Sequence, residues 1–287
     1  MGQPTSRPAD QQTKIKYADL HLHSTFSDGT FSPEELVNLA QGKGLCCIAI
    51  TDHDEVSAIA PASAAGKSCG LEVIPGVELS AEIDDCEVHI LGYFIDWQAS
   101  WFQQRLEKIR AVREKRIFAI TEKLKSFGID LDPEQILRQA HPGSVGRLHI
   151  ARLLKEKGYV ASIPEAFSSY LGNDRPCYVK KFKLTPGEAI EMIRQVNGLS
   201  VLAHPYHLSD DKITSDFVRW GIRGLEAYYP EHTPAATEHY LKLAEKNGLL
   251  VTGGSDCHGF GKDKSMLGAV KIPYQLVQAL KAEVGAS

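Results

Sequence analysis

The sequence contains no apolar run long enough to span a membrane, which argues against an integral membrane protein. Its first stretch, MGQPTSRPADQQTK, lacks the apolar middle of a secretory signal, so we expect residues 1–14 to form a disordered tail. The six cysteines lack the paired spacing of a disulfide framework, which favours reduced thiols and a cytoplasmic location. The net charge of −4 gives no indication of binding to duplex DNA.

What the sequence does contain is an alternation of apolar segments and helical patterns. Its 287 residues, 43% of them hydrophobic, suffice for one large α/β domain or for one domain carrying an insertion. Strands are predicted at residues 16–22, 45–51, 71–76, 88–95, 199–204, 224–229 and 249–256. Continuous apolar strands between helices favour a parallel sheet covered by helices, and this number of strands favours a closed or nearly closed barrel.

Three of the predicted helices begin with the same signal. Ser32, Thr185 and Thr233 each precede a proline, which places a capping hydroxyl before a proline at the first helical position. Glu35 and Glu188 stand three residues after their caps and complete two capping boxes. These signals mark where helices start between the strands.

One segment interrupts the alternation. From about Trp101 to Leu171 the sequence shows helical patterns and no convincing strand. Residues 101–160 contain 13 Lys plus Arg against 7 Asp plus Glu, a balance of +6. We interpret the segment as a basic helical insertion, although a solvated helix face explains most of its charges equally well.

Histidines and carboxylates fall at or near the carboxyl ends of nearly all the predicted strands. His21 and His23, in ADLHLHSTFSDG, lie on the same side of the first strand because side chains repeat with period two. The others are Asp52, His53, Glu78, His89, His204, Asp256 and His258. In α/β barrels this rim carries the active site, and imidazole and carboxylate ligands suit manganese, iron or zinc. We therefore predict a polynuclear metal site.

Six motifs carry a resemblance to a known family. HLHSTFSDG, ITDHD, GVELS, HILGY, LAHP and GSDCHG resemble, in order, those of the PHP family, the polymerase and histidinol phosphatase domain. The nearest subgroup in appearance has a helical insertion after HILGYFID and includes nucleoside 3′,5′-bisphosphate phosphatases and 5′-to-3′ exoribonucleases. The resemblance implies an α/β fold, a distorted (β/α)7 barrel with an inserted helical domain. The expected parts are the tail (1–14), the first barrel part (15–99), a helical insertion acting as a lid (100–175) and the second barrel part (176–287).

The resemblance also implies a trinuclear centre, commonly of three manganese ions, with iron or zinc as alternatives. The first ion would be held by His21, His23, Glu78 and Asp256, the second by Glu78 as a bridge with His89 and His204, and the third by Asp28, His53 and His258. Asp52 and Asp54 are expected to orient His53 as acceptors of its hydrogen bond. The side chain of Cys257 is expected to point away from the ions.

Such a centre suits phosphoester hydrolysis. Paired metal ions can share a hydroxide and neutralise charge on the phosphoryl oxygens, so we expect Glu78 and Asp256 to be essential for catalysis. The departing oxygen still needs a proton or a cation, for which His207 and His232 are candidates near the same rim. Each of them is equally well explained as a surface loop histidine.

Substrate-binding residues are predicted in and after the insertion. GSVGRLHIARLL resembles a pattern of the same subgroup, and it places Arg147 and His149 at the start of a helix, where N–H groups favour an anion. Without the resemblance, an exposed arginine and a packed histidine would be the simpler interpretation. Lys180, after the insertion, is a further candidate. We expect the lid to grip the phosphate that is not cleaved.

The predicted function is hydrolysis of phosphate esters of 5′-phosphorylated nucleotides, either nucleoside 3′,5′-bisphosphates or short 5′-phosphorylated oligoribonucleotides. The sequence does not separate these two substrates, and it leaves the oligomeric state open. One alternative is histidinol-phosphate phosphatase, against which the basic insertion favours a larger and more anionic substrate. The other is a non-catalytic PHP binding module, against which the complete ligand set argues. No membrane partner is expected.

Overall fold

The computed structural model describes residues 15–83, 86–140, 143–180, 184–205, 208, 211–262 and 266–285. The predicted tail, residues 1–14, lies outside them. Within the described residues, eight strands form one sheet in the order β7-β6-β5-β4-β3-β2-β1-β8. They are β1 (Tyr17–Leu22), β2 (Cys47–Ile50), β3 (Glu72–Ile83), β4 (Cys86–Tyr93), β5 (Leu199–Leu202), β6 (Gly224–Tyr228), β7 (Leu250–Gly253) and β8 (Ile272–Pro273).

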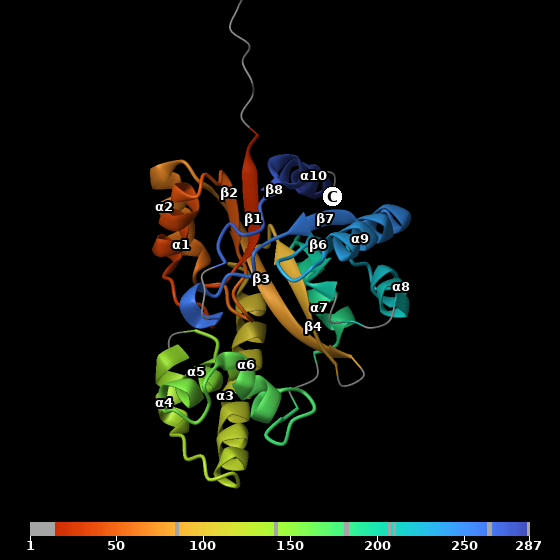
Figure 1. Ribbon diagram of the computed structural model, residues 1–287. Coiled ribbons are helices and arrows are strands. Elements are labelled where there is room, and N and C mark those ends of the chain that lie inside the picture. Colours follow the sequence, from red (N-terminus) through yellow and green to blue (C-terminus); the bar gives the residue numbers. More distant parts are fainter. Residues whose placement is uncertain are drawn as a thin grey trace, which may run out of the picture.

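The sheet curls into a nearly closed barrel with helices around it (Figure 1). Leu22, at the end of β1, forms a parallel bridge with Cys257, just beyond β7, so the two ends of the strand order approach each other. The barrel helices are α1 (Pro33–Gly42), α2 (Ile59–Cys69), α7 (Pro186–Gln195), α8 (Asp211–Arg219), α9 (Pro234–Asn247) and α10 (Tyr274–Gly285). The predicted fold class, a distorted (β/α) barrel, is confirmed.

The expectation of a wholly parallel sheet is wrong for β4. This strand pairs antiparallel with both of its neighbours, β3 and β5. The reason is the connection between β3 and β4, which is far too short for the crossover of a dozen or more residues that a parallel pair requires. Strand β3 is also longer than predicted, so that Glu78 lies in its middle and not after its end.

The predicted helix starts are confirmed. The side chains of Ser32, Thr185 and Thr233 each accept a hydrogen bond from a backbone N–H three residues on, at 3.2 Å. The capping boxes with Glu35 and Glu188 are both present. These caps stabilise α1, α7 and α9, which cover the barrel.

Between β4 and α7 the described residues form helices and connecting loops without a strand, and these helices lie below the barrel in Figure 1. They are α3 (Ser100–Lys125), α4 (Pro133–Ala140), α5 (Arg147–Glu156), α6 (Ile163–Ala166) and the π-helical turn η1 (Phe167–Leu171). Helix α3 belongs to two apolar cores: Phe102 and Leu106 pack with barrel residues, whereas Ile120 and Leu124 pack with the other insertion helices. This shared helix fixes the insertion against the barrel.

Two expectations about the chain as a whole can be compared with the described residues. None of the helices described is both long and apolar enough to cross a membrane. Cys46, Cys47, Cys69, Cys177 and Cys257 are free thiols. Cys257 is buried in an apolar cluster with Leu22 and Leu36, in agreement with the expectation that its side chain points away from the candidate ligands.

Candidate metal centre

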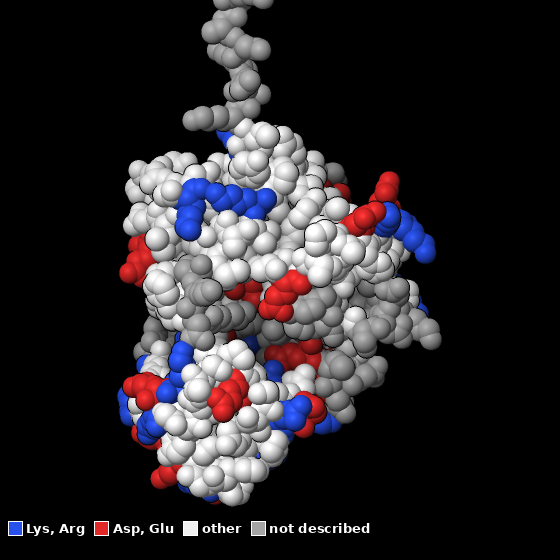
Figure 2. Space-filling model, viewed as in Figure 1, with Lys and Arg blue, Asp and Glu red and all other residues white. Residues whose placement is uncertain are grey.

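A cavity of about 640 Å³ lies where the barrel meets the insertion. The barrel contributes the candidate ligands Asp28, His53, Glu78, His89, His204, Asp256 and His258, together with Glu87, Tyr229 and Glu231. The insertion contributes Arg113, Arg116, Gly146, Arg147, Leu148, Ile163, Pro164 and Phe167. Figure 2 shows a hollow between the two parts, with acidic side chains at its edge.

His21 and His23 lie on the same side of β1, as the sequence predicted, and converge on two carboxylates. His21 Nε2 is 3.4 Å from both Glu78 Oε2 and Asp256 Oδ1. His23 Nε2 is 3.2 Å and 3.1 Å from the same two oxygens. Atoms that bind one tetrahedral ion at about 2.1 Å lie about 3.4 Å from each other. These four atoms therefore have the spacing of a metal coordination shell.

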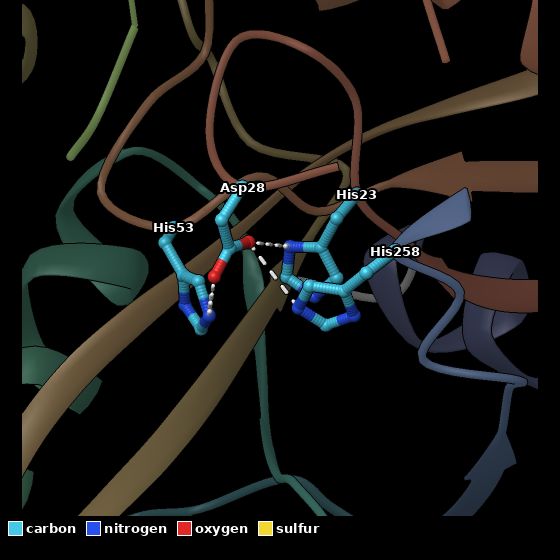
Figure 3. A group of neighbouring side chains, drawn as sticks. All are labelled: His23, Asp28, His53 and His258. Carbon is cyan, nitrogen blue, oxygen red and sulfur yellow. Dashed lines mark ion pairs between the residues drawn. The ribbon is translucent and has the colours of Figure 1, made fainter. Parts of the chain in front are cut away.

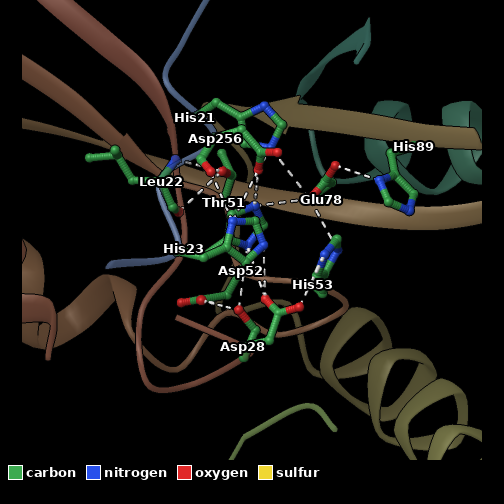
Figure 4. Close-up of polar contacts among 12 residues, drawn as sticks. His21, Leu22, His23, Asp28, Thr51, Asp52, His53, Glu78, His89 and Asp256 are labelled. Atoms are coloured by element: carbon green, nitrogen blue, oxygen red, sulfur yellow. Dashed lines mark hydrogen bonds and ion pairs between the residues drawn. The ribbon is translucent and has the colours of Figure 1, made fainter. Parts of the chain in front are cut away.

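Glu78 stands at the centre of the cluster and is 1% exposed (Figure 4). Its second oxygen, Oε1, is 2.8 Å from His89 Nδ1 and 3.3 Å from His204 Nε2, and these two nitrogens are 3.2 Å apart. The carboxylate thus faces one pair of histidines through Oε2 and another pair through Oε1. This is the geometry of a bridging ligand.

Asp28, His53 and His258 also come together, with His23 beside them (Figure 3). Asp28 Oδ1 is 3.2 Å from His258 Nε2, and Asp28 Oδ2 is 3.8 Å from His53 Nε2. His53 Nδ1 is 3.0 Å from Glu78 Oε2, so this ring lies between Asp28 and Glu78. The structure therefore brings together all nine residues predicted as ligands. His53, assigned to the third ion with Asp28 and His258, also faces the Glu78 carboxylate.

Several of these buried atoms make no hydrogen bond. They are His21 Nε2, His23 Nε2, Asp28 Oδ1, His53 Nδ1 and Glu78 Oε2. Buried polar atoms are normally satisfied, and a cluster of unsatisfied imidazole and carboxylate atoms is what a metal site looks like without its ions. Imidazole and carboxylate donors together fit manganese, iron or zinc. The residues present therefore fit the implied metal centre.

The pKa values of the clustered residues depend on one another because the imidazoles and carboxylates are buried side by side. Burial opposes ionisation of Glu78, but the surrounding imidazoles, that of His53 foremost, hold the pKa of its carboxyl well below its ordinary value. Burial likewise opposes protonation of His23, yet the neighbouring carboxylates of Asp256 and Glu78 raise its pKa to about 10. Burial also lowers the pKa of His53 well below its ordinary value, although the charges of Glu78 and Asp28 oppose this shift. Metal binding must therefore displace protons from part of the cluster.

Glu226 is a residue of the candidate site that the sequence analysis missed. It is fully buried on β6, where Oε1 lies 3.0 Å from His21 Nδ1 and Oε2 accepts the His204 backbone N–H at 2.8 Å. A carboxylate at Nδ1 makes this atom the protonated one and leaves Nε2 free to act as a ligand. The signal was present in GLEAYY, where a glutamate interrupts an apolar strand.

Further hydrogen bonds and backbone features fix the positions of the candidate ligands. The Tyr229 hydroxyl donates to Asp256 Oδ2 at 2.9 Å. A Cβ added to Gly254 would lie 2.4 Å from the Cβ of His21, so only glycine allows β7 to approach β1 this closely. His204 and Asp256 have φ angles of 27° and 48°, which are rare for residues other than glycine. Such backbone conformations are typical of functional sites.

Asp52 and Asp54 have partners other than those expected. Asp52 accepts from the backbone N–H of Ser24 at 2.7 Å and from the Ser24 hydroxyl at 2.6 Å. Asp54 accepts from Arg113 Nε at 2.6 Å and from the Ser80 backbone N–H at 3.1 Å. Asp52 therefore holds the loop after β1, and Asp54 joins the barrel to α3.

The predicted substrate-binding residues lie in different surroundings. Arg147 lines the cavity, and it donates to Glu87 Oε2 at 2.8 Å and to the Leu171 carbonyl oxygen at 2.9 Å. His149 is 3% exposed, and its Nδ1 accepts the Gly146 N–H at 3.1 Å, so it is a packed residue that caps α5. Lys180 is exposed.

The two histidines proposed for the departing oxygen have different outcomes. His207 lies outside the described residues. His232 is half-buried, its Nδ1 donates to the Ala227 carbonyl oxygen at 2.8 Å, and its ring packs against Tyr229 and Tyr240. In the loop between β6 and α9, which contains His232, the residues that line the cavity are Tyr229 and Glu231. The sequence analysis overlooked Tyr229 because a tyrosine at the end of an apolar predicted strand, residues 224–229, resembles a core residue.

Comparison with known proteins identifies the family. Residues 19–163 match the family model described as PHP domain. Over 250 residues the chain is 35% identical to a 5'-3' exoribonuclease of Haemophilus influenzae, which covers 85% of this chain and 90% of that protein. Over 250 residues it is 30% identical to a 3',5'-nucleoside bisphosphate phosphatase of Chromobacterium violaceum, and this alignment covers 85% of this chain and 88% of that protein.

Solved structures agree with these relatives. A crystal structure from Bifidobacterium adolescentis, of a protein proposed to be a metal-dependent phosphoesterase, matches with a TM-score of 0.85 at 30% identity. The match covers 92% of this chain and 95% of that one. The chain belongs to the PHP domain family. The resemblance stated from the six motifs is confirmed, and with it the predicted class of enzyme, a phosphoester hydrolase.

Proposed function

We propose that the chain hydrolyses phosphate esters of 5′-phosphorylated nucleotides, namely nucleoside 3′,5′-bisphosphates or short 5′-phosphorylated oligoribonucleotides. The names of the relatives in Haemophilus influenzae and Chromobacterium violaceum support this substrate class. The observation that carries the proposal is the convergence of buried, unsatisfied imidazole and carboxylate atoms beside a cavity whose opposite wall holds three arginines.

The proposal includes a centre of three manganese ions, with iron or zinc as the other metals that the ligands suit. The first ion would be held by His21, His23, Glu78 and Asp256, the second by Glu78, His89 and His204, and the third by Asp28, His53 and His258. Ions bound there supply Lewis acidity, which lowers the pKa of a bound water toward neutrality and offsets charge on the phosphoryl group.

The protein residues have separate roles in this proposal. Glu226 holds the His21 ring in the orientation that a ligand needs. Arg147, on the insertion side of the cavity, forms an ion pair with Glu87 and would offer a phosphate its planar fork, with Lys180 as a further cation. For the proton of the departing oxygen, Tyr229 is better placed than His232 because it lines the cavity.

The size and chemistry of the cavity favour a nucleotide over histidinol phosphate. About 640 Å³ is ample for a nucleoside with two phosphates, and Ile163, Pro164 and Phe167 give one wall an apolar surface. An apolar wall suits a base or a ribose better than the cationic amine of histidinol. We place the reaction in the cytoplasm, in keeping with the five free thiols.

The proposal is tested by metal analysis and by three substrates assayed side by side. We expect the purified protein to contain metal, to lose activity with a chelator, and to hydrolyse nucleoside 3′,5′-bisphosphate or 5′-phosphorylated RNA in preference to histidinol phosphate. Glu78→Gln should abolish activity and reduce the metal content, because a neutral amide is a poor bridge between two cations. Glu82→Gln, the same change on the same strand outside the ligand set, is the matched control.

Two results would contradict the proposal. Absence of metal in every preparation, with Glu78→Gln as active as the wild type, would exclude the metal centre. Preference for histidinol phosphate over both nucleotide substrates would exclude the substrate class and leave the centre intact.

A further inference from the structure

The insertion carries a second surface outside the cavity, which we call the aromatic patch and define by Lys123, Phe127, Tyr170 and Tyr178. Lys123 Nζ donates to the Tyr178 carbonyl oxygen at 2.6 Å. The rings of Phe127 and Tyr170 meet edge to face, with their centres 5.9 Å apart. The Cys177 backbone N–H donates to the Tyr170 carbonyl oxygen at 3.1 Å, which holds the two tyrosine segments together. The four residues therefore form one continuous surface.

The aromatic patch is open to water. Phe127, just beyond the end of α3, is 49% exposed, Lys123 is exposed, and both tyrosines are only partly buried. Apolar residues exposed singly are ordinary on a protein surface, but exposed aromatic rings that lie together are typical of an interaction site.

The aromatic patch is continuous with the cavity. The guanidinium carbons of Arg116 and Arg147, which both line the cavity, lie 5.4 Å and 5.6 Å from the centre of the Tyr178 ring. From Arg116, α3 runs away from the barrel toward Phe127 (Figure 1). The rise of a helix between these two positions is about 16 Å. A molecule too long for the cavity therefore meets the patch within this distance of the cavity wall.

Charge and chemistry indicate which molecule fits. The insertion is basic, whereas Glu231 lines the barrel side of the cavity and acidic side chains lie at the edge of the hollow (Figure 2). A long anion is therefore favoured along the insertion. Aromatic rings beside a lysine suit single-stranded nucleic acid, because bases stack on the rings and the lysine neutralises a phosphate. A duplex keeps its bases stacked inside and cannot use the rings.

We propose that the aromatic patch binds the single-stranded RNA that follows the 5′-terminal nucleotide in the cavity. Phe127 and the two tyrosines provide stacking surfaces, and Lys123 contacts the backbone. The inference rests on the proposed function, which places the 5′ end of the RNA at the candidate metal centre. A length of about 16 Å corresponds to about five stacked nucleotides. A nucleoside bisphosphate therefore ends before Phe127, whereas a longer RNA reaches it.

The test uses two substitutions in the patch and two matched controls on α3. Phe127→Ala removes an exposed ring, and Lys123→Gln removes an exposed charge. Phe118, which is 42% exposed, and Lys125 stand two positions from Arg116 and Lys123, so they face the other side of the helix. Phe118→Ala and Lys125→Gln are therefore the controls.

Two measurements separate binding from turnover. Fluorescence anisotropy with chelator-treated protein gives the affinity for a 5′-phosphorylated oligoadenylate of twelve nucleotides that carries a 3′ dye. Assays of the manganese-loaded protein give kcat/KM for the same RNA and for adenosine 3′,5′-bisphosphate. Sedimentation of each variant gives its oligomeric state.

We expect Phe127→Ala to weaken RNA binding and to lower kcat/KM for the RNA by about tenfold, while kcat/KM for the bisphosphate changes by less than about twofold. Lys123→Gln should weaken RNA binding by about threefold and make it less dependent on salt, because one phosphate contact is lost. The two control variants should behave as the wild type.

Wild-type RNA binding in both patch variants would overturn the inference. Equal losses on RNA and bisphosphate, or an equal loss of RNA binding in Phe118→Ala, would also overturn it. So would a dimer that Phe127→Ala converts to monomers without loss of RNA affinity, because the patch would then bind a second copy of the chain. A wild type that hydrolyses neither substrate would refute the proposed function, and the anisotropy measurements would still decide about the patch.

Discussion

Replacement of Glu226 by glutamine tests whether a buried carboxylate fixes the proton of a candidate ligand. Glu226 accepts two hydrogen bonds, one from the His204 backbone N–H and one from His21 Nδ1. Glutamine has one acceptor oxygen and one amide group that only donates. If the oxygen keeps the backbone N–H, the amide faces His21 Nδ1, which must then give up its proton. The proton moves to Nε2, the atom that lies 3.4 Å from both Glu78 Oε2 and Asp256 Oδ1.

The expected magnitude follows from this loss of one ligand. Substitution of such supporting residues typically weakens metal binding by about 10- to 100-fold, or about 1.4–2.7 kcal/mol. Glu226→Gln should therefore release one metal ion more readily than the wild type, while the fold, whose core keeps its volume, persists. Competition with a fluorescent chelator measures the affinity, and elemental analysis after gel filtration measures the number of ions retained.

Glu82→Gln again serves as the control, because it neutralises a buried carboxylate of β3 outside the ligand set. Wild-type metal affinity in Glu226→Gln, within about twofold, would refute the reasoning about the His21 proton. Loss of metal to the same extent in Glu82→Gln would also refute it, because the effect would then follow from any change of buried charge.

Two further predictions concern the insertion. Arg147→Ala should lower kcat/KM for a nucleoside bisphosphate by about tenfold or more, because the contact with its second phosphate is lost. The value of kcat/KM for an aryl phosphate should fall by less, because this substrate is affected only by the loss of the ion pair between Arg147 and Glu87. No loss on either substrate would remove Arg147 from this role. Burial lowers the pKa of His149 from 6.5 to about 4, so the unfolded chain takes up the proton first and stability is lost as the pH falls below about 6.5. His149→Gln removes this titration, while the glutamine can still accept the Gly146 N–H. Between pH 7 and pH 5, in the presence of chelator, the free energy of unfolding of His149→Gln should fall by about 2 kcal/mol less than that of the wild type. An equal fall in both proteins would contradict this.

The barrel and the convergence of its candidate ligands were predictable because local patterns encode them. Period-two spacing placed His21 and His23 on one side of β1, and hydroxyl-proline pairs marked the starts of three helices. The direction of β4 was not predictable in this way, since an apolar run has the same appearance in a parallel and an antiparallel strand. Only the short connection before it carried that information.

The supporting residues were harder to predict because their partners are distant in the sequence. Glu226 contacts His21 across 205 positions, and no local pattern reports such a pair. The arginines of α3 resemble one another in the sequence, and only packing distinguishes the paired Arg113 from Arg116. Arg147, predicted to bind substrate, lines the cavity, but its ion pair with Glu87 was not foreseen.

The contact between the first and last parts of the barrel has a consequence for biosynthesis. The backbone N–H of Ser255 donates to Asp19 Oδ1 across 236 positions, and Asp256 follows directly. At about 5–20 residues per second, a ribosome needs about 10–50 s to make the chain between these two points. During that interval His21 and His23 have been synthesised while Asp256 has not. The nascent barrel therefore waits for its last strands with an open edge, and the complete set of candidate ligands exists only after Asp256 and His258 have been synthesised.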